Sequence, residues 1–204
     1  PQVSDSQLLG VAFLELFGLG NHQADAAASI RELPSGIGVQ PHAPYSCGTE
    51  LYLAAITSGR PLATHLAETH DEFEATTQGT GTLVDLAKRL GAWDESVQLW
   101  DGHPVDVLLA MLGNNPMVAA HVNYIEERHL ALLAESQVTV AYCPRSSTYF
   151  GHENHRVQEM LASGVSVALG TDSLICLDTP DRISVLDEMR VLYRSGGFDS
   201  ASLI

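Results

Sequence analysis

The stretch PLATHLAET (residues 61–69) decides the fold. It begins with a brief apolar run, 61–64, of the kind that forms a buried strand. His65 follows this run at once, and Glu68 comes three residues later. An imidazole and a carboxylate directly after a buried strand are typical of an active-site edge, although a charged helix start is the simpler interpretation of such a segment. The rest of the chain decides between the two.

Five other runs share the short, apolar character of residues 61–64 and show little polar alternation, which is typical of strands buried on both faces of a parallel sheet. We predict strands at 11–16, 37–40, 61–64, 117–120, 138–142 and 165–169. We predict helices between or after them at 48–57, 82–90, 105–112, 126–135, 157–162 and 182–193. This alternation predicts an α/β fold in one domain, residues 1–204, with 21–35 as the least structured stretch.

Ionisable side chains gather at the ends of these predicted strands. Glu15 lies within the first strand, His42, His65 and His121 follow the next three, and Asp172 follows the sixth. In a (β/α)8 barrel the carboxyl ends of the strands form the active-site face. An open doubly wound sheet collects its ligand only at one switch point, and the chain has neither of the glycine-rich nucleotide motifs. We therefore predict a TIM-type barrel. A barrel needs eight strands and six are visible here, so either two strands are missing from this chain or the count of six is too low.

The composition of the chain restricts the classes of partner and the compartment that can be expected. The formal charge of −15 disfavours a nucleic-acid partner. No apolar run approaches the roughly 18–20 residues that span a bilayer, and the first residues lack the pattern of a signal peptide. The three cysteines form no CxxC pair, which favours a reducing compartment. We expect a cytoplasmic protein with a small-molecule substrate and no membrane partner, and the sequence leaves a homo-oligomer open.

His65, His121 and Asp172 carry the donor types that zinc or iron prefers. A lone histidine is more often a structural residue, but three such residues just past separate strands favour a shared site. A bound divalent metal lowers the pKa of a water molecule from about 15.7 towards 7. A carboxyl close to that water molecule is then suited to carry protons during hydrolysis.

Five segments together resemble the amidohydrolase superfamily. They are, in order, PHAPYS (41–46), THLAET (64–69), AAHVNY (119–124), YCPRSS (142–147) and LGTDS (169–173). Within the superfamily, the branch they resemble most contains the cytosine, guanine and S-adenosylhomocysteine deaminases and the triazine chlorohydrolases. The resemblance covers almost the whole chain and makes the six predicted strands the third to the eighth of the barrel.

The resemblance implies a role for each of five residues. His65 resembles a metal ligand after strand five, and Asp172 resembles a ligand after strand eight that also accepts a proton from the bound water. His121 resembles a residue that binds the metal or the water. Glu68 resembles the proton shuttle, and His42 a substrate contact. The implied cofactor is one divalent metal, zinc first and iron second.

The chain departs from the superfamily pattern in one respect. It contains no H-x-H pair, which the superfamily places at the end of strand one to anchor the metal. We therefore expect an internal, truncated part of a longer protein that lacks strands one and two and the flanking β-sandwich. The leading hypothesis is a metal-dependent aminohydrolase that deaminates a heteroaromatic ring. The alternatives are an amidase or dechlorinating hydrolase of the same superfamily, and a catalytically inactive barrel fragment.

Other residues have weaker signals. Arg145 is a candidate substrate-binding residue, but packing at the surface is the favoured interpretation. Glu72 is expected in a solvated helix start, since acidic groups favour helix N-termini. Cys143 is expected to be a buried packing residue rather than a nucleophile. For His152 and His155, a place at the mouth of the pocket and a purely structural role are equally favoured.

Overall fold

Six parallel strands in chain order form the framework of the computed structural model, which describes residues 10–152, 154–179 and 181–199. The strands are β1 (Ala12–Leu16), β2 (Ile37–Pro41), β3 (Ala63–Leu66), β4 (Met117–His121), β5 (Val138–Tyr142) and β6 (Ser166–Leu169). All six predicted strands are therefore confirmed, with ends that shift by two residues at most. His65 and His121 lie within the last two residues of β3 and β4, rather than beyond these strands.

The strands pair strictly with their sequence neighbours. β1 pairs with β2, and β3, β4, β5 and β6 form a four-stranded sheet in that order. A bridge between Val39 and Leu62 joins the two sheets, and the His65 backbone N–H donates to the His42 carbonyl at 2.8 Å. Because every pairing is parallel, all six carboxyl ends lie along one edge. This is the arrangement of consecutive barrel strands, as the sequence predicted.

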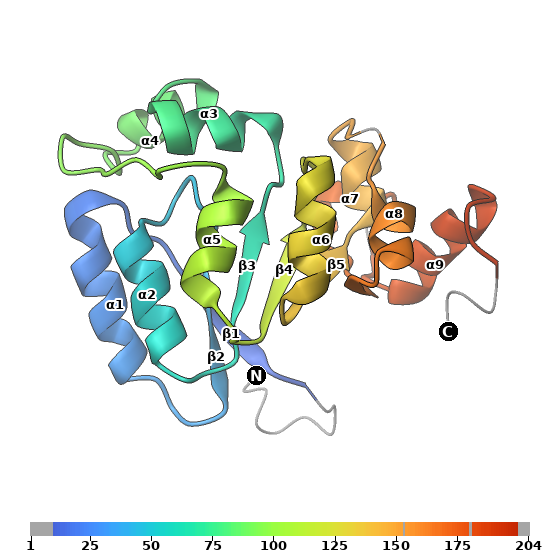
Figure 1. Cartoon of the computed structure of the whole chain (residues 1–204), viewed down its shortest axis with the longest axis horizontal. Helices are drawn as coiled ribbons and strands as arrows, with labels where there is room; N and C mark the ends of the chain where they lie inside the picture. The colour runs from blue at the N-terminus through green and yellow to red at the C-terminus, as the bar shows by residue number, and fades with distance from the viewer. Residues whose placement is uncertain (1–9, 153, 180, 200–204) are drawn as a thin grey trace.

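Helices connect the strands and cover them (Figure 1). They are α1 (Gln23–Arg31), α2 (Thr49–Thr57), α3 (His70–Gln78), α4 (Thr82–Arg89), α5 (Pro104–Leu112), α6 (Glu127–Glu135), α7 (Pro144–Tyr149), α8 (Val157–Ala162) and α9 (Val185–Arg194). Short 3-10 turns occupy Gly20–His22 and Leu174–Cys176. The main core forms where α2, α5 and α6 meet the strands, around Leu51, Leu66, Leu108 and Val140. None of the helices in the described ranges is long and apolar enough to cross a membrane.

The expectation that residues 21–35 are the least structured stretch is wrong, because α1 occupies most of it. Four alanines in QADAAASIR give this segment a high helix propensity without a strong apolar stripe. Tertiary contacts also hold it in place. The buried Gln23 side chain accepts hydrogen bonds from the backbone N–H groups of Glu50 and Leu51 at 3.0 and 3.3 Å, at the start of α2.

Candidate active site

The carboxyl edge of the strands brings together residues that are far apart in sequence. Ligand atoms of Glu68, His121 and Asp172 all lie within 4.8 Å of one another. The His65 ring stacks against the His121 ring, with centroids 5.4 Å apart. The four residues predicted to bind metal or carry protons therefore form one cluster, which we call the strand-end cluster.

The backbone around this cluster adopts a conformation that is rare for residues other than glycine. Ala67, His121 and Asp172 have φ angles of 48°, 71° and 57°, in the left-handed region. Such conformations carry strain, and they persist where surrounding contacts hold them. Ala67 and His121 lie where the chain leaves β3 and β4, and Asp172 lies in the loop after β6.

His65 is oriented as a metal ligand should be. Its Nδ1 lies 2.8 Å from the backbone carbonyl oxygen of His42. A carbonyl only accepts hydrogen bonds, so Nδ1 carries the proton and Nε2 keeps a free lone pair. Histidines that bind metals usually have this second hydrogen bond, which fixes the ring and its tautomer. Together with His121 and Asp172, the donor set fits zinc or iron.

Glu68 and His121 have the electrostatic properties that proton transfer needs. Glu68 Oε1 lies 3.6 Å from His121 Nε2, and the Tyr45 hydroxyl donates to Glu68 Oε2 at 3.2 Å. Burial raises the pKa of Glu68, although His65 and Tyr45 oppose the rise. Burial, with His65 nearby, lowers the pKa of His121 to about 4. At neutral pH His121 is therefore neutral, and Glu68 holds a proton more readily than an ordinary glutamate.

Asp172 has the opposite tendency. Burial disfavours its charge, but hydrogen bonds from the Ser146 hydroxyl and the Ser173 backbone N–H, together with His121, outweigh burial and lower its pKa. The carboxylate therefore stays ionised at neutral pH. One carboxyl that favours its proton and one that favours its charge is the division that acid–base catalysis requires.

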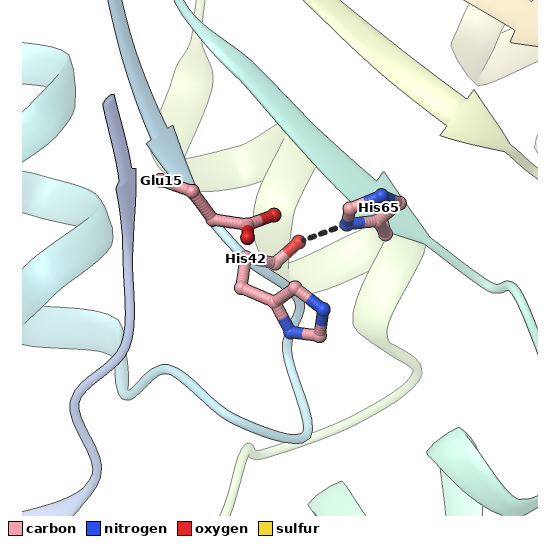
Figure 2. Close-up of side chains that lie close together, drawn as sticks. All are labelled: Glu15, His42 and His65. Atoms are coloured by element: carbon pink, nitrogen blue, oxygen red, sulfur yellow. Dashed lines mark hydrogen bonds between the residues drawn. The ribbon is translucent and has the colours of Figure 1, made fainter. Parts of the chain in front are cut away.

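A second group of candidate ligands adjoins the first. Figure 2 shows Glu15, His42 and His65 together at the ends of β1, β2 and β3, and their ligand atoms lie within 4.8 Å of one another. His42 Nδ1 lies 2.7 Å from the Ser46 hydroxyl, and the ring stacks on Phe17. Burial and His65 lower the pKa of His42 to about 4. His42 is thus a neutral hydrogen-bonding group beside the strand-end cluster.

A cavity of about 590 Å³ opens beside His42. Its walls are mostly apolar and come from the loops after β1 and β2 and from α4: Phe17, Leu19, Tyr45, Leu83, Leu86 and Leu90. A mostly apolar pocket with a few polar groups at one end is typical of a small-molecule site. The strand-end cluster lies at that polar end, since His42 and Tyr45 belong to the cavity and contact His65 and Glu68 respectively.

Arg145 does not pack at the surface, so that expectation is wrong. Its guanidinium is buried and donates to Glu188 at 2.6 Å and to Asp178 at 2.9 Å. Glu188 is itself fully buried, and a buried carboxylate requires such a partner. The role of Arg145 in binding substrate stays a prediction, since its contacts in the described residues lie with these two carboxylates and Thr179.

The structure also places the weaker candidates. Cys143 is buried, as predicted for a packing residue, and burial raises its pKa to about 12. His155 lies behind the cluster, where its Nε2 donates to the His121 carbonyl at 2.8 Å and its ring stacks on Tyr142. His152 Nδ1 lies 2.8 Å from the Tyr124 hydroxyl. The helix start predicted around Glu72 exists, but Glu72 is buried rather than solvated.

Another group of histidine and carboxylate side chains lies away from the strand ends. His103, Asp106 and His129 have ligand atoms within 4.8 Å of one another, and the two rings lie 4.4 Å apart. The group comes from the start of α5 and the first turn of α6, so we call it the helix-cap cluster. No strand precedes either histidine closely, and the packing of two helices brings them together.

Comparison with known proteins identifies the class. Residues 22–204 match the Amidohydrolase family, and the chain belongs to that family. Similar proteins include 5-methylthioadenosine/S-adenosylhomocysteine deaminases. That of Moorella thermoacetica is 36% identical over 138 residues, which cover 65% of this chain and 27% of the relative. That of Pyrococcus furiosus is 32% identical over 155 residues, 74% of this chain and 32% of the relative.

Solved structures show the same fold. Helicobacter pylori aminofutalosine deaminase in complex with methylthio-coformycin superposes with a TM-score of 0.76 at 21% identity, over 98% of this chain and 51% of that one. E. coli guanine deaminase gives 0.66 at 19% identity, over 96% and 46%. The chain therefore spans about half of these structures and about a third of the curated relatives. The barrel-type fold and its incompleteness agree with the prediction from the sequence.

Proposed function

We propose that the protein is a metal-dependent aminohydrolase that removes the amino group of an amino-substituted heteroaromatic ring. The observation that carries the proposal is the convergence of Glu68, His121 and Asp172 beside His65 at the strand ends. The named activities of the relatives, which are deaminases, support it. We further propose a cytoplasmic setting and one partial barrel domain over residues 1–204. Two more histidine ligands would come from the strand-one H-x-H pair of the full-length protein.

His65, His121 and Asp172 would hold the metal, with zinc preferred over iron. When bound, the metal supplies hydroxide at neutral pH by lowering the pKa of a water molecule towards 7. With the metal bound, the ionised Asp172 would be able to accept a proton from that water, and the neutral His121 would offer the metal an uncharged nitrogen. The donor types and the charges that the fold imposes on each group support these assignments.

Glu68 is proposed to carry the proton between two positions. As the water oxygen bonds to the ring carbon, Glu68 donates its proton to the adjacent ring nitrogen, which keeps charge from building up there. Glu68 then takes the second water proton and delivers it to the amino group, which leaves as ammonia when the carbon–nitrogen bond breaks. The proton taken up by Asp172 returns to Glu68, so that both carboxyl groups end in the states in which they began. The pocket beside His42 would bind the ring, with His42 as a hydrogen-bonding contact.

The test uses the full-length protein loaded with zinc. It is offered a panel of aminopurine nucleosides, guanine, cytosine and aminopterins, and ammonia release is measured. We expect ammonia from at least one purine, and release that is about 10²- to 10⁴-fold slower when Glu68→Gln replaces the wild type. Zinc-loaded protein that releases no ammonia from any of them would contradict the proposal. Release of chloride from a chlorotriazine, or hydrolysis of an amide, would then favour the dechlorinating or amidase alternative, and failure to bind zinc would favour the inactive barrel.

A further inference from the structure

The loop that carries Glu68 is held by an unusual partner. The Glu72 carboxylate accepts the backbone N–H of Ala67 at 2.8 Å with one oxygen and that of Glu68 at 3.3 Å with the other. Ala67 has the left-handed φ of 48° described above. One side chain thus holds two successive amides at the point where the backbone is strained.

The opposite side of the same loop is held by the segment after β4. Asn123 Nδ2 donates to the Glu68 carbonyl at 2.9 Å, and the backbone N–H groups of Asn123 and Tyr124 both donate to the Ala67 carbonyl at 3.0 Å. The Ser147 hydroxyl donates to Asn123 Oδ1 at 3.2 Å and fixes the amide. Both faces of the Ala67–Glu68 backbone are therefore constrained, while the Glu68 side chain points to His121 and Tyr45.

Burial of Glu72 is more than a helix start requires. An acidic residue in the first turn stabilises a helix even when its side chain is exposed to water. Glu72 is instead only 1% exposed, and burial raises its pKa to about 8. Taking a carboxyl out of water costs free energy, which the two amide hydrogen bonds only partly offset. A residue retained at that cost acts on what it contacts, and its contacts are the amides of the Glu68 loop.

We infer that Glu72, together with Asn123, is a positioning residue that fixes the loop so that the Glu68 carboxyl faces the reacting ring. The inference rests on the proposed function, in which Glu68 carries the proton. Glu72 itself touches neither substrate nor metal. It acts on the rate only through the direction of Glu68, because displacement of a catalytic group by about 1 Å can cost about 100-fold in rate.

Glu72→Gln in the full-length, zinc-loaded protein tests the inference. The amide keeps one acceptor but sets an N–H₂ group against the second backbone N–H, so one of the two bonds is lost. We expect kcat per bound zinc to fall about 10- to 100-fold, with KM and zinc content unchanged. Glu74→Gln, on the same helix, makes the same substitution where the contact is the Thr80 hydroxyl, and it leaves kcat unchanged.

A double-mutant cycle separates positioning from a merely structural role. In a Glu68→Gln background the further change Glu72→Gln should cost nothing more, because the group it positions is already gone. An equal loss in both backgrounds would overturn the inference. If Glu72→Gln does not fold, Asn123→Ala, which releases the Glu68 carbonyl, replaces it in the same cycle with the same two outcomes.

A second readout is independent of turnover. In a crystal structure of zinc-loaded Glu72→Gln, the Glu68 carboxyl should move away from His121 Nε2, from which it lies 3.6 Å in the wild type. Wild-type protein that releases no ammonia contradicts the proposed function alone. The position of Glu68 then decides the inference, and an unmoved carboxyl overturns it.

Discussion

The strand-end cluster and the helix-cap cluster contain the same kinds of residue at similar spacing, yet their chemistry differs. Each has histidine and carboxylate atoms within 4.8 Å of one another. In the strand-end cluster, His65 Nδ1 donates to a backbone carbonyl, which leaves Nε2 free to bind a metal. In the helix-cap cluster, Nδ1 of His103 and Nδ1 of His129 each accept a backbone N–H, from Val105 and Glu126 respectively. In the neutral ring Nε2 then keeps the proton and has no lone pair to offer.

The carboxylates differ in the same way. Asp106 is already paired with Arg128 and lies 3.2 Å from His129 Nε2. Both histidines cap helices: His103 is the N-cap of α5, and His129 forms a capping box with Glu126 at the start of α6. The backbone partner of Nδ1, rather than composition or proximity, therefore decides which cluster is suited to a metal.

The sharpest contrast comes from the same carboxylate-to-amide change in each cluster. Glu68→Gln should lower kcat of the zinc-loaded, full-length protein about 10²- to 10⁴-fold, the usual contribution of a general acid–base group. Asp106→Asn should leave kcat unchanged, because its partners are Arg128 and His129. Steady-state ammonia release, normalised to bound zinc, measures both. A comparable loss of kcat in Asp106→Asn would remove the distinction between the clusters.

Zinc binding tests directly which histidines have an Nε2 lone pair free to bind a metal. His65→Gln should weaken zinc binding by more than about 100-fold, since even the outer-shell partners of a metal contribute 10- to 100-fold. His129→Gln should bind zinc as the wild type does. Zinc titration of the metal-free protein against a chelating indicator compares the two. Loss of zinc in His129→Gln, with its fold intact by circular dichroism, would mean that the helix-cap cluster binds metal.

The strands and the residues at their ends follow from local sequence. Apolar runs without polar alternation identify buried parallel strands, and the carboxyl ends of parallel strands must meet. His65, His121 and Asp172 could therefore be expected together, although nothing in their spacing fixes which nitrogen faces the site. That depends on the His42 carbonyl, which belongs to a different strand end.

The features that could not be predicted depend on partners distant in sequence. Arg145 reads as a surface residue because arginines are mostly exposed, and only the approach of Glu188 on α9 buries it. Glu72 has the sequence context of a solvated helix start, but the fold turns it inward onto the Glu68 loop. His103 and His129 meet only because α5 packs against α6. In each case tertiary contacts override a correct local preference.

The helix-cap cluster should contribute more than the strand-end cluster to the stability of the metal-free protein. His129→Ala removes a fully buried side chain and leaves the Glu126 N–H without its acceptor, so the free energy of unfolding should fall by about 1–3 kcal/mol. His65→Ala leaves only a carbonyl without its donor, and this carbonyl also accepts the His65 backbone N–H. Its effect should be smaller. Urea denaturation at pH 7 checks both, and a larger loss in His65→Ala would contradict the structural role assigned to His129.

The smallest expected effect is a pH dependence that has opposite signs at two groups. His103 has its pKa lowered from 6.5 to about 4 by burial and by His129. Between these values the unfolded chain binds more protons, so the stability from this group is present above pH 6.5 and is lost as pH falls towards 4. Glu72 has its pKa raised from 4.5 to about 8, so the folded protein binds more protons and stability falls as pH rises through that range.

His103→Gln should therefore flatten the acidic side of the stability profile, and Glu72→Gln should flatten the side between pH 5 and 8. The His103 effect is modest because water screens a half-buried ring. Urea denaturation of the metal-free wild type and both variants measures the slopes. It is done at about pH 4.5, 6 and 8, because the two groups titrate over roughly this range. If His103→Gln keeps the full acid slope, His103 is not held neutral by its cap, and the tautomer assigned to the helix-cap cluster is wrong.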